Sequence, residues 1–152
     1  MPKMSSKSKI KDRNNNKEFA KKLEKRTKKF AVHIIRLSTK LPNTPEARVV
    51  RYQMTKAGTS VGANYREANR ARSKADFRNK IDICETEASE TQYWLEMIIE
   101  VGWLTREDLK WEYEECSELL AIFTSIGKKE VAIVLLGDSN FCSSNFSHSS
   151  SL

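Results

Sequence analysis

The sequence predicts an all-α protein, an antiparallel up-down-up-down bundle of four helices. Between residues 17 and 127, apolar side chains recur every three or four positions in four successive segments, the spacing that places them on one face of a helix. Proline, glycine and capping residues separate the segments by short links, and short links join antiparallel neighbours. A chain of 152 residues suffices for one domain with its own core.

The first helix is predicted to follow a disordered basic arm. Residues 1–16 are rich in Lys, Ser and Asn and offer too little apolar surface to offset the entropy of ordering them. The helix after them is predicted to end at Pro42 and Pro45, which also mark the start of the next one. Its apolar stripe comprises Phe19, Leu23, Phe30, Ile34, Leu37 and Leu41.

The second helix has a clear start and an unusual middle. Thr44 is the expected N-cap, with Pro45 at the first helical position and Glu46 at the positive end of the helix dipole. Gly58 and Gly62 interrupt the helix at about 1 kcal/mol each relative to Ala. Either a neighbouring backbone passes closely over these glycines, or the helix kinks or breaks there. The apolar stripe comprises Val50, Met54, Ala57, Val61 and Ala68.

The third and fourth helices are bounded by capping signals. Ser73 with Asp76 resembles a capping box, and Gly102 is the expected C-cap of the third helix. Thr105 is expected to cap the fourth helix, which is predicted to stop at Gly127. The seam of the third helix comprises Phe77, Ile81, Cys84, Ala88, Thr91, Leu95 and Ile98. That of the fourth comprises Leu109, Trp111, Cys116, Leu119, Leu120, Phe123 and Ile126.

The remaining residues, 128–152, are predicted to form a Ser-rich tail that is partly or wholly disordered. Its apolar run VAIVLLG, residues 131–137, is compatible with a strand-like edge, an extension of the fourth helix, or a disordered segment.

Three segments of the sequence carry a family resemblance. They are GTSVGANYREA at 58–68, RARSKADFRNKI at 70–81 and EASETQYWLE at 87–96. Over about residues 30–126 the chain resembles the four-helix bundle proteins of the 23S rRNA-intervening-sequence family, which has relatives among the accessory variability proteins of diversity-generating retroelements. The resemblance implies an antiparallel bundle that assembles into a ring, usually a homopentamer, without known catalytic activity. The retroelement relatives carry a basic ring that works with a reverse transcriptase.

The charge of the chain is distributed unevenly. Residues 1–72 carry 20 Lys and Arg against 5 Asp and Glu, whereas residues 73–127 carry 5 against 13. Such asymmetry predicts contact of the basic half with nucleic acid, RNA or DNA, or packing of a basic helix pair against an acidic pair. The second possibility makes the protein a scaffold whose two halves serve assembly only. The candidate nucleic-acid-binding residues are Lys21, Lys22, Lys25, Arg26, Lys28, Lys29, Arg70 and Arg72.

Polar residues of the family motif predict an internal network. Asn64, Tyr65 and Arg66 follow the glycine pair, and the third helix offers Glu87 and Glu90. A partly buried guanidinium needs a carboxylate partner. We therefore expect hydrogen bonds between Arg66 and one of the two glutamates.

A second apolar face on and after the third helix predicts an oligomer interface. It lies partly off the main seam and would remain uncovered in a lone bundle, and exposed aromatic patches usually mark interfaces. Its members are Tyr93, Trp94, Met97 and Trp103.

Catalysis, cofactors and membrane contact are not expected. His33 and His148 are far apart and neither has a second ligand at helical spacing, so no metal site or catalytic base is predicted. Cys84, Cys116 and Cys142 lack the spacing of a disulfide framework or metal site, which favours the reducing interior of a bacterial cytoplasm. Apolar runs fall short of the roughly 18 residues of a membrane span, and no signal peptide is recognisable.

Overall fold

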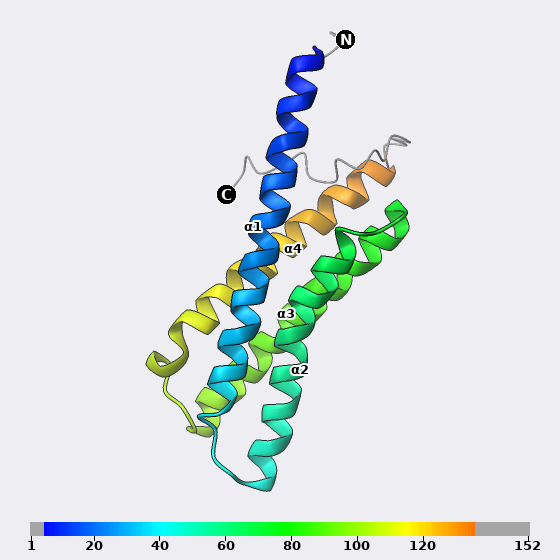
Figure 1. Cartoon of the computed structure of the whole chain (residues 1–152). Coiled ribbons are helices and arrows are strands. Elements are labelled where there is room, and N and C mark those ends of the chain that lie inside the picture. The colour runs from blue at the N-terminus through cyan, green and yellow to red at the C-terminus, as the bar shows by residue number, and fades with distance from the viewer. Residues whose placement is uncertain (1–4, 136–152) are drawn as a thin grey trace.

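Four long α-helices joined by short links make up the chain in its computed structural model, which describes residues 5–135 and the side chains as far as residue 130 (Figure 1). The helices are α1 (Ser6–Ser38), α2 (Pro45–Ala68), α3 (Lys74–Val101) and α4 (Lys110–Leu135), with a short 3₁₀ helix η1 (Glu107–Leu109) before α4. The described part of the chain contains no strand. The prediction of an all-α protein with four helices is confirmed.

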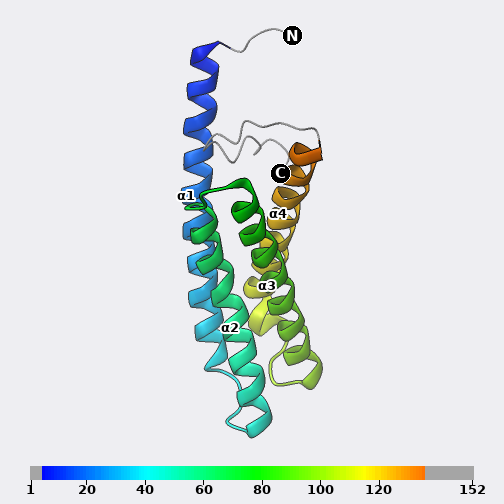
Figure 2. The same cartoon turned by 90° about the vertical axis from the view of Figure 1, so that its right-hand side faces the viewer.

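Successive helices run antiparallel and pack against one another. Helix α2 lies between α1 and α3, and α4 packs on α3 (Figures 1 and 2). Helices α1 and α4 close the bundle with a much smaller contact, because α4 passes behind α1 at an angle (Figure 1). One face of α1 therefore lies on the outside of the bundle along its whole length.

Local capping chemistry sets the helix boundaries largely as the sequence predicts. Thr44 accepts a hydrogen bond from the amide of Ala47 and caps α2, and Ser73 accepts one from Asp76 and caps α3. Gly102 ends α3 in the left-handed conformation, with φ of 81°, which glycine adopts without strain. Thr105 and Asp108 bond each other reciprocally, but the first turn that they open is η1 rather than α4 itself.

The predicted apolar stripes form the core. All seven seam residues of α3 are buried, as are the stripe residues of α1 except Phe19 and those of α2 except Val50, which are both partly buried against the core. The largest fully buried side chain, Tyr65, is a core residue of α2 outside the predicted stripe. It fits the same helical spacing, four residues after Val61 and three before Ala68, and its polar hydroxyl concealed that role.

The glycine pair lies where α2 packs closely against α1. A Cβ atom placed on Gly58 would lie 2.9 Å from Cγ2 of Ile34, and one on Gly62 would lie 3.3 Å from the backbone carbonyl carbon of Thr27. Helix α2 continues without interruption from residue 45 to residue 68. Close backbone approach is therefore confirmed, and the alternative of a break at the glycines is wrong.

Both ends of the bundle are longer than predicted. Residues 6–16, expected in a disordered arm, form the first turns of α1, and Ser5 caps them by accepting a bond from the amide of Ser8. Lys and Arg favour helix, and extending an existing helix fixes only one further residue for each hydrogen bond. Residues 1–4 lie outside the described part of the chain.

Helix α4 does not stop at Gly127 but continues to Leu135, so of the three possibilities for the apolar run the helix extension holds that far. Glu130 lies buried on this extension. Burial raises the pKa of its carboxyl group, and nearby Lys74 and Arg78 at the start of α3 partly offset that rise. The rest of the predicted tail, residues 136–152, lies outside the described residues.

Candidate nucleic-acid interface

The outer face of α1 presents a row of lysines to solvent. Lys21, Lys25 and Lys28 are exposed, and none of them takes part in an ion pair within the described part of the chain. They lie on the side of α1 opposite the buried Leu23 and Phe30, because the helical repeat of 3.6 residues separates the two sets. These three lysines are called the lysine row below. Lys22 lies beside the row and pairs with Glu18 at 2.9 Å, with both side chains exposed.

Two of the predicted nucleic-acid-binding residues instead hold α1 against α4. Arg26 donates from Nε and Nη2 to the two carboxylate oxygens of Glu115, at 2.5 and 2.9 Å, and also bonds Glu118. The ammonium group of Lys29 lies 5.1 Å from the centre of the Trp111 ring, within the range of a cation–π interaction. Arg26 is therefore engaged inside the bundle, and Lys29 is only partly available to a ligand.

His33 continues the same contact one to two turns further along α1. Its ring stacks on Trp111 with centroids 3.9 Å apart, and Nδ1 lies 3.1 Å from a carboxylate oxygen of Glu112. The acidic start of α4 thus faces one flank of α1, while the lysine row lies on the outer face of the helix. Complementary packing of basic and acidic helices, the alternative to nucleic-acid binding, therefore explains the flank of α1 that faces α4. It does not explain the lysine row, which has no ion-pair partner among the described residues.

Replacing Arg26 with methionine is expected to destabilise the protein by about 1–2 kcal/mol, because the Glu115 carboxylate, with a side chain only 11% exposed, would lose its charged partner. Lys25→Met, one residue earlier, removes an unpaired exposed charge and should change stability by no more than about 0.5 kcal/mol. Urea denaturation of both variants checks this. Equal effects of the two substitutions would show that the Arg26 contact carries no stability.

Arg70 and Arg72 are exposed on the link between α2 and α3. The side-chain amide of Asn69, at the end of α2, donates to a carboxylate oxygen of Glu24 of α1 at 2.7 Å and so fixes the start of this link beside the middle of α1. Figure 1 shows the link leading from the end of α2 away from α1 to the start of α3. The two arginines therefore lie on the link and outside the lysine row of α1.

The predicted Arg66 network is not formed. Arg66 is exposed, and the structure shows no bond from it to Glu87 or Glu90. The buried position belongs to its neighbour Tyr65, whose ring packs on Phe123 with centroids 5.6 Å apart. Burial holds the pKa of Tyr65 far above its usual value.

The other polar residues of the motif also act locally. Asn64 donates to the carbonyl of Ser60 within α2, at 2.9 Å. Burial, reinforced by the charge of Glu90, raises the pKa of Glu87. Glu90 accepts a hydrogen bond from the indole of Trp94, at 3.2 Å. The motif therefore shapes the bundle and its surface and does not assemble a polar site.

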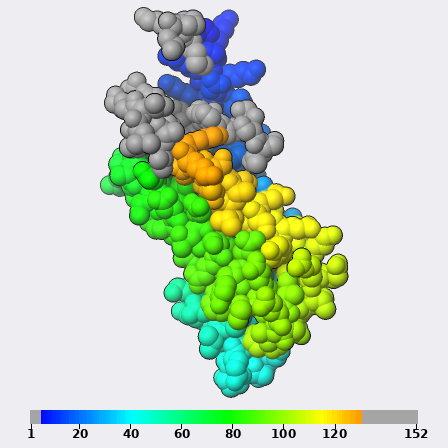
Figure 3. Space-filling model, turned by 180° about the vertical axis from the view of Figure 1, so that it is seen from behind, coloured from blue at the N-terminus to red at the C-terminus, as the bar shows by residue number. Residues whose placement is uncertain are grey.

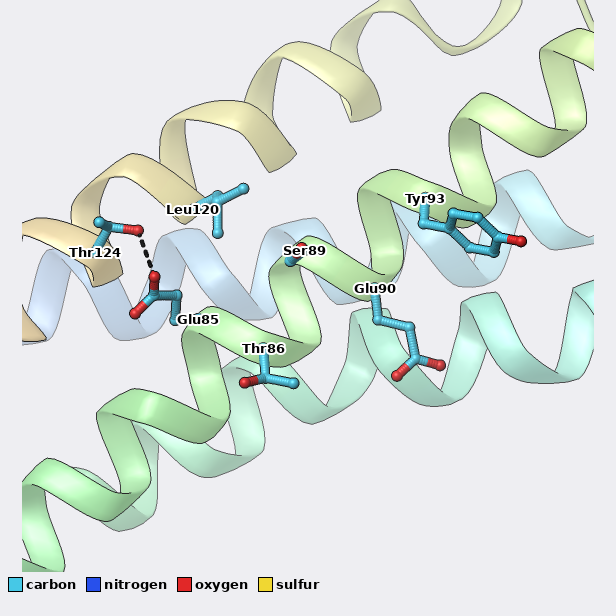
Figure 4. A pocket seen from close by; sticks show the side chains of 7 residues that line it. All are labelled: Glu85, Thr86, Ser89, Glu90, Tyr93, Leu120 and Thr124. Atoms are coloured by element: carbon cyan, nitrogen blue, oxygen red, sulfur yellow. Dashed lines mark hydrogen bonds between the residues drawn. The ribbon is translucent and has the colours of Figure 1, made fainter.

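The predicted interface residues are only partly exposed. Tyr93 is 52% exposed, whereas Trp94 and Trp103 pack partly against the bundle core and Met97 is half-buried. Tyr93 borders an open recess of about 610 Å³ between α3 and α4, whose other lining residues are Glu85, Thr86, Ser89, Glu90, Leu120 and Thr124 (Figure 4). Two carboxylates line this recess and no cation does, so it repels phosphate.

No helix in the part of the chain that the structure describes is both long and apolar enough to cross a membrane. Nor do the described side chains bring three His, Cys, Asp or Glu together as metal ligands would be.

Comparisons with known proteins place the chain in a protein family. The model of the 23S rRNA-intervening sequence protein family matches residues 20–125. No curated protein matches the chain significantly. A crystal structure of a protein of unknown function from the S23 ribosomal protein family of Bacteroides thetaiotaomicron is 40% identical and covers 69% of this chain and 97% of its own, with a TM-score of 0.64. This chain belongs to the 23S rRNA-intervening sequence protein family.

Proposed function

We propose that the protein binds RNA through the lysine row of α1 and has no catalytic activity of its own. The observation that carries this proposal is the exposure of Lys21, Lys25 and Lys28 without intramolecular partners, although α4 offers carboxylates to the neighbouring flank of α1. Lysines neutralise phosphates and release their counterions, which favours binding without regard to base sequence. The family's association with an rRNA intervening sequence makes RNA the first ligand to consider, with DNA as the second.

The proposed active form is a homo-oligomer, a ring of five subunits in the cytoplasm. Exposed Tyr93 and the half-buried Trp94 and Met97 offer an aromatic surface to a second copy, and a ring would present the lysine row once per subunit. Light scattering should give about five times 17.5 kDa. A monomer at micromolar concentration would contradict this assembly. The further partner that the retroelement relatives suggest is a reverse transcriptase or another nucleic-acid enzyme.

Charge reversal in the lysine row tests the RNA proposal. The variant Lys21→Glu/Lys25→Glu/Lys28→Glu should bind single-stranded RNA at least tenfold more weakly in filter binding. If three phosphate contacts are lost, the slope of log affinity against log salt should become shallower by about 2, at roughly 0.7 per contact.

The matched control is Lys56→Glu/Lys110→Glu/Lys128→Glu, which makes the same change in net charge at exposed positions on α2 and α4. It should retain most of the affinity, and light scattering should show one mass for all three proteins. Failure of the parent to bind RNA or DNA at low salt, or equal losses in the two variants, would favour the alternative, a scaffold whose basic and acidic halves serve assembly only. The bonds from Arg26 to Glu115 and Glu118 are the observation on that side.

A further inference from the structure

The first turns of α1 project beyond the rest of the bundle. Figures 1 and 2 show the start of α1 extending past the ends of α2, α3 and α4, and Figure 3 shows the same extension from behind. In residues 6–15, here called the projecting segment, every side chain is exposed except Ser8, which is half-buried. The match to the family model begins at residue 20, so this segment lies outside the matched residues.

Lysines of the projecting segment continue the lysine row. At 3.6 residues per turn, Lys7 lies about five full turns, or roughly 27 Å, before Lys25 and on the same line along the helix. Lys11 lies close to that line, one turn after Lys7. Together with the lysine row they form a band of exposed cations along one side of α1, here called the lysine ridge: Lys7, Lys11, Lys21, Lys25 and Lys28. Glu18, which pairs with Lys22, lies on the same side of α1 between Lys11 and Lys21.

The lysine ridge offers no surface for stacking bases. The aromatic side chains of α1 are all turned away from it: Phe30 is fully buried, Phe19 packs partly on the core, and His33 stacks on Trp111. Proteins that hold single strands combine a basic groove with aromatic side chains on which successive bases stack. A ridge of cations alone recognises phosphates and leaves bases unread.

We infer that the ligand of the lysine ridge is a nucleic-acid double helix, contacted through its phosphates. A duplex carries its phosphates at fixed positions along a straight axis and hides its bases, and B-DNA has about one charge per 1.7 Å of axis. A straight helix whose cations extend over roughly 30 Å matches such a ligand without bending it. The inference rests on the proposed nucleic-acid binding and adds the class of ligand and the part played by the projecting segment.

The test compares duplexes with single strands. Filter binding at about 0.15 M salt, where the Debye length is about 8 Å, uses an RNA duplex of about 16 base pairs, the DNA duplex of the same sequence, and each unpaired strand. The full chain should bind at least one duplex fivefold or more tightly than its strands. Comparing the affinities of the two duplexes shows whether RNA or DNA is the preferred ligand.

Two charge-reversal pairs in the projecting segment supply the matched comparison. Lys7→Glu/Lys11→Glu removes two cations from the lysine ridge, whereas Lys9→Glu/Arg13→Glu makes the same charge change on the opposite side of the same turns. The first pair should weaken duplex binding at least fivefold and make the salt slope shallower by about 1.8, at roughly 0.9 per contact. The second should change affinity less than twofold, with circular dichroism showing unchanged helix content in both.

Single strands that bind as tightly as the duplexes, or equal losses in the two variants, would overturn the inference. If single strands bind best and the binding still depends on Lys21, Lys25 and Lys28, the inference fails while the proposed function stands. If no nucleic acid binds, both fail.

Discussion

Replacing Gly58 with leucine should destabilise the bundle by about 1–3 kcal/mol, the usual cost of overpacking a well-packed core. Even the first added carbon would lie 2.9 Å from Cγ2 of Ile34, closer than Cβ contacts occur. Ile34 is fully buried and branched at Cβ, so it cannot turn aside without disturbing its own neighbours. Leucine has the higher helix propensity by several tenths of a kcal/mol, and this favourable effect is too small to reverse the sign.

Gly127→Ala is the matched control for the glycine substitution. Gly127 is also a buried glycine inside a helix, but a Cβ there would meet nothing closer than 3.8 Å. Alanine should therefore stabilise α4 by about 0.5–1 kcal/mol through helix propensity alone. Denaturant titrations decide between the two signs. A Gly58→Leu variant as stable as the parent would show that α1 and α2 are further apart at this point than the structure has them.

The protein should lose stability steeply in alkaline solution because of two buried thiols. Cys84 and Cys116 are fully buried, and their thiols donate to the carbonyls of Val61 and Ala88 on the neighbouring helices, at 3.5 and 3.2 Å. Burial raises the pKa of each from 9.0 to about 12.

The sign of this effect follows from where the proton is held. The folded chain keeps both thiols protonated at a pH at which the unfolded chain releases the protons, so the pKa difference stabilises the fold fully below about pH 9. That stability is lost as the pH rises toward about 12, by up to about 1.4 kcal/mol per pH unit for each thiol.

A double variant isolates the contribution of the thiols. Cys84→Ala/Cys116→Ala should be less stable than the parent at neutral pH because of the lost volume, but its stability should fall less steeply with pH. Urea denaturation at several pH values between about 8 and 11 measures both slopes. Parallel slopes would show that the thiols titrate normally and are not held in the core. Thiol reagents offer a second check, since neither buried cysteine should react in the folded protein.

The sequence alone predicts those features that depend on short-range chemistry. The caps at Thr44 and Ser73 and the stop at Gly102 require only neighbouring residues, and the seam of α3 follows from one repeat along one helix. The same logic explains the error at Arg66. Consecutive residues on a helix differ by about 100° in direction, so burial of Tyr65 in the core turns Arg66 toward solvent.

The sequence alone does not predict which helices pack against one another. Periodicity shows which side of α1 faces the core, but the two flanks of that side are equivalent until α2 and α4 are placed. Gly62 approaches α1 rather than α3, and Arg26 faces α4 rather than solvent, for reasons that involve three helices at once. The composition of the projecting segment predicts a disordered arm, whereas its helical state follows from continuity with the anchored part of α1.

Lysine footprinting tests the central claim, that the outer face of α1 contacts RNA, without changing any residue. The folded protein is acetylated briefly with and without saturating RNA, and the modification of each lysine is measured by mass spectrometry. Lys21, Lys25 and Lys28 should lose most of their reactivity when RNA is bound, whereas Lys110 and Lys128, which are equally exposed on α4, should keep theirs. Undiminished reactivity of the three α1 lysines in an RNA complex, or equal protection of the two α4 lysines, would contradict the claim.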